Sequence, residues 1–152
     1  LMLFITYFGE GSVLIIGALF AIFILCYAKK KDYAFILLIS IIFGQIFVFL
    51  LKTIIQRSRP PPINALIYEG SYSFPSGHAF VAISFYFLLT YFFYRGSKNK
   101  ILKLIILFIG IMIVFGIGIS RIYLGVHWPT DILASYTMGL AWIVLLNLCL
   151  EA

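Results

Sequence analysis

The stretch that decides the fold is ILKLIILFIGIMIVFGIGI, residues 101–119, in which Lys103 is the only charged residue. An α-helix needs roughly 17 to 25 apolar residues to cross the hydrocarbon core of a bilayer, and this stretch has that length. It shows no alternation of apolar and polar residues with a period of two, as a membrane β-strand would. The sequence therefore predicts a transmembrane helix here.

The composition of the whole chain is that of a membrane protein. Of its 152 residues, 64% are hydrophobic and 11% are charged, and the mean hydropathy is +1.14. Soluble domains carry about a quarter of charged residues, and disordered chains have a much lower hydrophobic content. Both classes are excluded, and the lipid bilayer is the expected surroundings of the chain.

Four further apolar stretches have a comparable length, and few charges interrupt them. They run from Ser12 to Ala28, from Tyr33 to Leu51, from Ala79 to Tyr94 and from Ile132 to Leu150. We expect an all-α, polytopic bundle of transmembrane helices with five full crossings, preceded by the apolar stub Leu1–Phe8. The stub is too short to span alone, so it is either an interfacial segment or the end of a sixth crossing. No repeat or long linker divides the chain, and we expect residues 1–152 to form a single domain.

Charge in the connecting loops predicts the orientation. One cluster is Lys29, Lys30 and Lys31, and a second cluster, two crossings later, is Arg95, Lys98, Lys100 and Lys103. The positive-inside rule places both clusters in the cytoplasm. These seven of the eleven basic residues account for most of the net charge of +6, so no nucleic-acid partner is needed.

The two cysteines, Cys26 and Cys149, lie inside apolar runs, with no Cys or His at the spacing of metal ligands. We expect them to be buried packing residues rather than a disulfide or a zinc site.

The predicted outer loops hold an unexpected set of polar residues. They contain four basic residues, both histidines of the chain and one aspartate: Lys52, Arg57, Arg59, Arg121, His78, His127 and Asp131. The positive-inside rule disfavours basic residues on this face. An anionic ligand is the simplest reason for their presence.

Helix ends supply a geometry for such a ligand. Ser76 precedes Gly77 and an apolar helix, so it can cap that helix while free backbone N–H groups point outward, as in phosphate sites at helix N-termini. Pro129 suits the first turn of the last helix, which leaves His127 just before that helix and Asp131 inside its first turn.

Each of these residues has an ordinary structural explanation when taken alone. A lysine or arginine at a helix end, such as Lys52 or Arg121, commonly reaches for the interface. Ser76 and Gly77 can be a simple cap, and Asp131 can simply complement a helix N-terminus. Arg57 has no partner that the sequence assigns, and we expect it to contact a headgroup or a loop. The functional interpretation rests on the residues coming together at one membrane face.

Their spacing resembles the signature of the type 2 phosphatidic acid phosphatase superfamily, the integral membrane lipid phosphate phosphatases. Its first part is Lys, six residues, then Arg-Pro, as in Lys52 to Arg59-Pro60. The second is Pro-Ser-Gly-His, residues 75–78, and the third joins Ser120-Arg121, His127 and Asp131. No signature position departs from the pattern, and the matched region covers over half of the chain. The usual six crossings of the family's membrane members are the one difference.

The resemblance implies a role for each matching residue. His127 would be the nucleophile that forms a phosphohistidine, and Asp131 would hold its other ring nitrogen. His78 would protonate the leaving oxygen and later deprotonate water. The phosphoryl oxygens would be bound by Lys52, Arg59, Ser76, the Gly77 N–H and Arg121. No metal or other cofactor is expected in this reaction.

The expected activity is metal-independent hydrolysis of a lipid phosphate or diphosphate at the outer leaflet of a bacterial cytoplasmic membrane. Small bacterial relatives, as the resemblance implies, act on undecaprenyl diphosphate, phosphatidylglycerol phosphate or the 1-phosphate of lipid A. The motifs do not separate these substrates, and no obligate protein partner is inferred.

The alternative is a transporter or flippase for phosphate-bearing lipids, which would need polar residues near mid-bilayer. The crossings offer only scattered ones: Ser40, Gln45, Ser84, Thr90, Ser135, Thr137 and Asn147.

Overall fold

Helices form the framework of the chain. The computed structural model describes residues 1–151, apart from the side chains of Asn64 and of residues 149–151. No strand occurs within this range, so the all-α prediction is confirmed. The elements in chain order are α1 (Met2–Tyr7), α2 (Gly11–Tyr27), α3 (Lys31–Ile55), η1 (Pro62–Asn64), α4 (Gly77–Val81), η2 (Ala82–Phe87), α5 (Leu88–Gly96), α6 (Lys100–Tyr123) and α7 (Pro129–Glu151).

Four helical segments of the described chain are long and apolar enough to cross a membrane. They are α3, the continuous helix Gly77–Gly96, α6 and, within α7, Pro129–Leu148. The remaining predicted crossing is α2, an apolar helix of 17 residues. Large apolar side chains cover the outside of these helices; Phe20, Phe49 and Phe108 are 67%, 65% and 65% exposed. Such a surface requires lipid, and the chain is an integral membrane protein.

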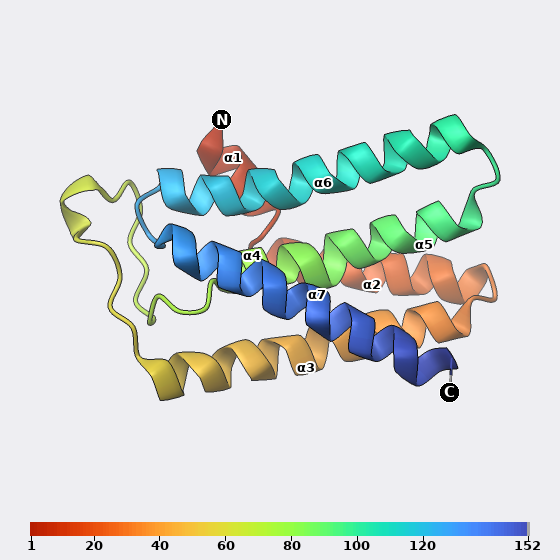
Figure 1. Cartoon of the computed structure of the whole chain (residues 1–152), viewed down its shortest axis with the longest axis horizontal. Helices are drawn as coiled ribbons and strands as arrows, with labels where there is room; N and C mark the ends of the chain where they lie inside the picture. Colours follow the sequence, from red (N-terminus) through yellow and green to blue (C-terminus); the bar gives the residue numbers. More distant parts are fainter. Residues whose placement is uncertain (152) are drawn as a thin grey trace.

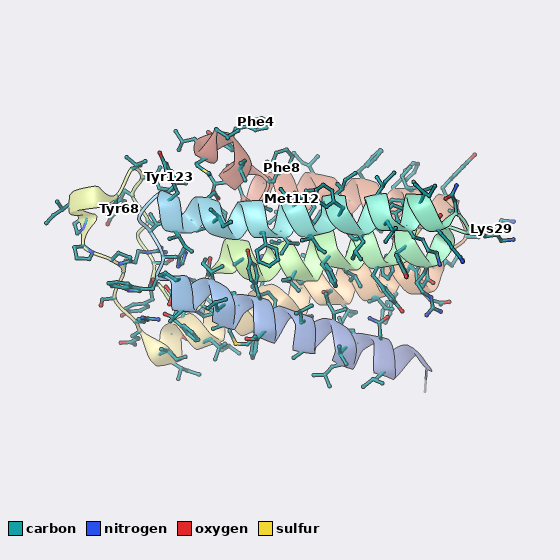
Figure 2. All side chains as sticks on the ribbon, turned by 45° about the horizontal axis from the view of Figure 1, so that its top comes forward. Phe4, Phe8, Lys29, Tyr68, Met112 and Tyr123 are labelled. Atoms are coloured by element: carbon teal, nitrogen blue, oxygen red, sulfur yellow. The ribbon has the colours of Figure 1, made fainter. Side chains whose placement is uncertain are left out.

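The loops collect at the two ends of the bundle. In Figure 1 the long connection from α3 to α4 and the short one from α6 to α7 lie at the left end, while the turns from α2 to α3 and from α5 to α6 lie at the right. Figure 2 shows Tyr68 and Tyr123 at one end and Lys29 at the other. The two predicted groups of loops therefore lie at opposite ends of the bundle.

The apolar stub Leu1–Phe8 contains α1, which packs along α6. Figure 2 shows Phe4 and Phe8 on the same side of the bundle as Met112 of α6. A Cβ added at Gly116 of α6 would lie 3.5 Å from Cγ2 of Ile5, and Tyr86 Oη donates to the Phe8 carbonyl over 2.7 Å. These contacts hold the stub against the bundle, close to the end that carries the histidines.

The third crossing is not a plain α-helix. It consists of α4, the π-helical turn η2 and α5, and it begins at Gly77, two residues before the predicted start. Two glycines let neighbouring helices come close to it: a Cβ at Gly44 of α3 would lie 2.8 Å from Cε1 of Phe80, and one at Gly139 of α7 would lie 2.9 Å from Cβ of Ile83. These close contacts position α4, which carries His78.

The prediction that Cys26 is buried was wrong, because its side chain is exposed on α2. An apolar thiol faces lipid at no great cost, so a membrane helix need not bury it. The side chain of Cys149 lies outside the described residues.

Candidate active site

The residues selected from the sequence lie at the end of the bundle where α3 and α6 end and where α4 and α7 begin. Lys52 is in the last turn of α3, Arg121 is in the last turn of α6, and Asp131 is in the first turn of α7. His127 lies in the turn between α6 and α7, and Arg59 lies in the connection from α3 to α4. Hydrogen bonds and ion pairs link most of these side chains.

Ser76 and His78 begin the third crossing. The predicted N-cap is confirmed, because the buried Ser76 Oγ accepts the N–H of Ala79 over 3.4 Å. His78 packs against the bend between α1 and α2, where a Cβ at Gly9 would lie only 2.6 Å from its Cδ2. Only glycine leaves room for the imidazole here, and the N-terminal segment thus forms one wall of the site.

His127 and Asp131 are paired in the protein interior. His127 Nδ1 lies 3.4 Å from Asp131 Oδ2, and the two residues are 4% and 0% exposed. The same carboxylate oxygen accepts the N–H of Trp128 over 3.0 Å and the hydroxyl of Ser73. A buried carboxylate with this many donors stays ionised and fixed in orientation.

Arg57 has a structural partner that the sequence did not indicate. Its Nη1 donates to Asp131 Oδ1 over 2.7 Å and to Thr130 Oγ1 over 2.8 Å, and its guanidinium lies 5.6 Å from the ring centre of Trp128. The expected loop contact is confirmed by Trp128, which lies in the turn from α6 to α7, and the ion pair with Asp131 is an additional partner. Arg57 neutralises Asp131, which would otherwise be a costly buried charge.

The hydrogen bonds around His127 fix its tautomer. Asp131, as a carboxylate, accepts a proton from Nδ1, while Arg59 Nη1 lies 3.3 Å from Nε2 and can only donate. Nε2 therefore presents a lone pair. Burial lowers the pKa of His127, the bond with Asp131 opposes that shift, and the charges of Arg59, Arg121 and Lys52 lower the pKa further. The imidazole is neutral at neutral pH, and its unprotonated Nε2 faces the cationic cluster.

Arg121 is almost fully buried, at 1% exposure. Its Nη1 donates to Thr6 Oγ1 of α1 over 2.8 Å, and its Nη2 forms an ion pair with Glu69 Oε1. Among the described residues its buried Nε has no hydrogen-bond partner. The guanidinium is therefore rigidly held, with its Nε donor still unused.

Lys52 and Arg59 bind the segment Glu69–Tyr72 of the connection from α3 to α4. Lys52 Nζ donates to the Tyr72 carbonyl, and Arg59 Nε donates to the Ser71 carbonyl over 2.7 Å. Arg59 Nη1 also donates to the Val126 carbonyl over 2.6 Å, beside His127. A cavity of about 510 Å³ borders this cluster, and its lining includes Lys52, Arg57 and Arg59.

Ser73, Glu69 and Thr6 were not selected from the sequence. Glu69 could have been noticed, because it is the only acidic residue in the connection from α3 to α4, which also carries Arg57 and Arg59. Ser73 and Thr6 have no such signal, since they meet their partners across 58 and 115 residues of sequence.

Comparison with known proteins agrees with this arrangement. Residues 33–152 match the PAP2 superfamily. The chain belongs to the PAP2 superfamily. The membership predicted from the three motifs, Lys52 to Pro60, Pro75 to His78 and Ser120 to Asp131, is confirmed.

Two curated relatives of the chain are named for lipid phosphatases. Phosphatidylglycerophosphatase B of Bacillus subtilis (strain 168) is 37% identical over 147 residues, which cover 90% of this chain and 67% of the relative. An undecaprenyl-diphosphatase of Sulfolobus acidocaldarius is 27% identical over 160 residues, covering all of this chain and 70% of the relative. The crystal structure of a transmembrane PAP2 type phosphatidylglycerolphosphate phosphatase from Bacillus subtilis superimposes with a TM-score of 0.88 at 32% identity, over 99% of this chain and 75% of that chain.

Proposed function

We propose that the protein hydrolyses the terminal phosphate of a lipid phosphate or diphosphate at the outer leaflet, without a metal, through a phosphohistidine on His127. The observation that carries this proposal is the environment of His127. Its Nδ1 is engaged by Asp131 and its Nε2 lone pair faces Arg59, with Lys52 and Arg121 in the same cluster. A neutral nucleophile beside three cations suits attack on a phosphoryl group.

In the first step, Nε2 of His127 attacks phosphorus and the bond from phosphorus to the lipid oxygen breaks. Lys52, Arg59 and Arg121 bind the non-bridging oxygens, with Ser76 and the Gly77 N–H, and stabilise the charge of the transition state. His78 takes up a proton when the negatively charged phosphate binds beside it, and it donates this proton to the leaving lipid oxygen. Asp131 stabilises the positive charge that develops on His127.

In the second step, neutral His78 takes a proton from a water molecule that attacks phosphorus. The P–N bond to His127 breaks and inorganic phosphate leaves. Both steps exchange one proton through His78, so the enzyme returns to its starting state.

The substrate can be identified with purified protein and a panel of lipids. Phosphatidylglycerol phosphate is the first candidate because of the B. subtilis relative, and undecaprenyl diphosphate and lipid A 1-phosphate complete the panel. We expect inorganic phosphate to be released from at least one of them and none from phosphatidylglycerol, which has no terminal phosphate. Absence of release from the whole panel would contradict the proposed function.

The same assay tests the chemistry. Activity is expected to persist in EDTA and to be inhibited by vanadate, which can become five-coordinate on His127 and imitate the transition state. Loss of activity in EDTA with recovery on addition of Mg²⁺ would contradict the metal-independent mechanism.

We further propose that α2 is a fifth crossing and that residues 1–152 act as a single domain. At 17 residues, α2 has a length of about 25 Å, slightly less than the hydrocarbon core. α1 contacts the C-terminal part of α6, at Gly116 and Arg121. These contacts support an arrangement in which α1 and α2 together span the thickness of the bilayer. The lysine clusters favour a site on the extracytoplasmic side of a bacterial cytoplasmic membrane.

Cysteine labelling on intact cells tests this orientation. In a chain with Cys26 and Cys149 replaced by alanine, we expect an impermeant thiol reagent to label Ile63→Cys but not Lys98→Cys. Ile63 is 90% exposed in the connection from α3 to α4, and Lys98 is exposed in the turn from α5 to α6. Both variants should be labelled after the cells are permeabilised. The reverse pattern on intact cells would place the site in the cytoplasm.

The transport alternative finds less support in the geometry. Three of the polar side chains within the crossings bond to helix backbones: Ser40 to the Ser84 carbonyl, Thr90 to that of Tyr86 and Asn147 to that of Ile143. Side chains engaged in this way do not line a path for a charged headgroup.

A further inference from the structure

Glu69 lies where a substrate phosphate has to bind. One carboxylate oxygen, Oε1, is paired with Nη2 of Arg121, and the other, Oε2, lies 3.8 Å from Nη2 of Arg59. These two arginines are the ones expected to hold the phosphoryl oxygens. The carboxylate therefore bridges them in the manner of an anionic ligand.

The buried guanidinium of Arg121 is built for a larger anion than this carboxylate. Within the described residues, its Nε is buried and has no hydrogen-bond acceptor, although Nη1 and Nη2 are engaged. An unpaired donor in the interior is costly. A phosphate has three terminal oxygens and can accept from Nε and Nη2 together, whereas Glu69 reaches only Nη2.

The segment that carries Glu69 can release it without disturbing the catalytic pair. Backbone bonds fix the segment at both ends, from Leu66 N to the Leu124 carbonyl over 3.0 Å and from Ser73 N to the Arg57 carbonyl over 2.9 Å. The side-chain bonds of Lys52 and Arg59 hold it at Tyr72 and Ser71, on the C-terminal side of Glu69. Between these points Tyr68 is 91% exposed, and the Glu69 side chain is 29% exposed. Rotation of this side chain toward solvent would remove the carboxylate from both arginines, while Arg59 stays bonded to Ser71 and Val126 and Arg121 stays bonded to Thr6.

We propose that Glu69 is a specificity-determining residue that occupies the phosphate position in the resting enzyme and excludes phosphodiester headgroups. This inference rests on the proposed function, because it takes Arg59 and Arg121 as the phosphate ligands. Substrate binding then exchanges the carboxylate for a terminal phosphate on the same two arginines.

Charge explains the selectivity of this exchange. A phosphodiester headgroup carries one negative charge, like a carboxylate, and competes poorly with a tethered group whose effective concentration is on the order of millimolar. A terminal phosphate carries about −1.5 to −2 charges at neutral pH and has three acceptor oxygens. It gains more from the cationic cluster than Glu69 does. A membrane presents phosphodiester lipids in great excess, so an open cluster would bind them instead of substrate.

Ligand binding to the full chain in detergent tests this role. The readout is the rise of the unfolding midpoint with increasing concentrations of inorganic phosphate or of dimethyl phosphate, a phosphodiester without a lipid tail. For the wild type we expect a saturable rise with inorganic phosphate and none with dimethyl phosphate. For Glu69→Gln we expect dimethyl phosphate to bind as well, and inorganic phosphate to bind about tenfold more tightly, as when a competitor occupies the site nine-tenths of the time.

Two further variants make the outcome decisive. Glu10→Gln removes a carboxylate at the start of α2 that, among the described residues, accepts from Ser12 alone, over 3.3 Å, and it should behave as the wild type. Glu69→Asp keeps the charge on a shorter arm that cannot span both arginines, and we expect about threefold tighter phosphate binding. It provides the comparison if Glu69→Gln does not fold.

The opposite result is a lower starting midpoint for the Glu69 variants with unchanged affinities for both ligands. It would show that Glu69 is only a structural ion-pair partner and would overturn the inference. Because this readout needs no turnover, the proposed function is judged separately. A wild type that binds phosphate but hydrolyses no lipid of the panel contradicts the function and leaves the test of Glu69 intact.

Discussion

His127→Ala is expected to lower the rate of lipid phosphate hydrolysis by a factor on the order of 10⁴ or more, because it removes the nucleophile of a covalent mechanism. The variant should also form no phosphoenzyme. The measurement is rapid acid-free quenching of the enzyme with ³²P-labelled substrate, followed by a test of the label for the acid lability of a P–N bond. Wild-type enzyme should carry this label on His127.

The controls for His127→Ala separate chemistry from folding. The variant retains Asp131 with its partners Arg57, Ser73 and the Trp128 N–H, so its unfolding midpoint should stay near that of the wild type. Asp131→Asn should give a weaker version of the same loss by favouring the wrong tautomer of His127. Normal turnover by His127→Ala, or label on His78 in the wild type, would show that the roles of the two histidines are reversed.

His78→Ala is expected to slow hydrolysis of a lipid phosphate by about 10² to 10⁴, the usual contribution of general acid–base catalysis. The loss should be much smaller for formation of the phosphoenzyme from a nitrophenyl phosphate, because nitrophenolate leaves without a proton. The comparison therefore measures the burst of nitrophenol separately from the later release of inorganic phosphate.

The second half of the reaction sharpens this test. His78 also activates water, so the His78→Ala phosphoenzyme should accumulate after the burst instead of turning over. An equal loss for both substrates, with no accumulation, would mean that His78 acts by binding phosphate and not by transferring protons.

Much of the fold could be predicted because the bilayer leaves few choices. A span without water must satisfy its backbone internally, so stretches such as Ile101–Ile119 and Ile132–Leu150 become helices. Helix ends also follow local rules, which is why the cap at Ser76 and the position of Pro129 at the start of α7 were predicted correctly. Each crossing takes the chain to the other side of the membrane, so alternate helix ends share a face. This alternation alone predicted that Lys52, Arg121 and Asp131 would lie together.

The remaining features depend on contacts that local sequence rules do not describe. Arg57 and Ser73 engage Asp131 through the folded path of a long loop, and Thr6 reaches Arg121 because α1 turns back along α6. The position of Glu69 depends on the folded path of the same loop. The exposure of Cys26 was not predicted for another reason. In a membrane, lipid can replace protein as the neighbour of an apolar side chain, so hydrophobicity no longer predicts burial.

The π-helical turn Ala82–Phe87 changes the direction in which side chains point around the axis of the third crossing, so the faces before and after the turn are not in register. Each residue of an α-helix advances the chain by about 100°, and a π turn accommodates one residue more than an α turn does. The half that begins at Gly77 can thus aim His78 at the proposed phosphate position, while the half that ends at Gly96 keeps Leu88 and Phe92 in the core. Deleting one residue from this turn would restore a regular helix and swing one half around relative to the other. When PAP2 sequences are aligned, a one-residue gap at this turn is therefore a difference in phase, and the two halves of the helix should be compared separately on either side of it.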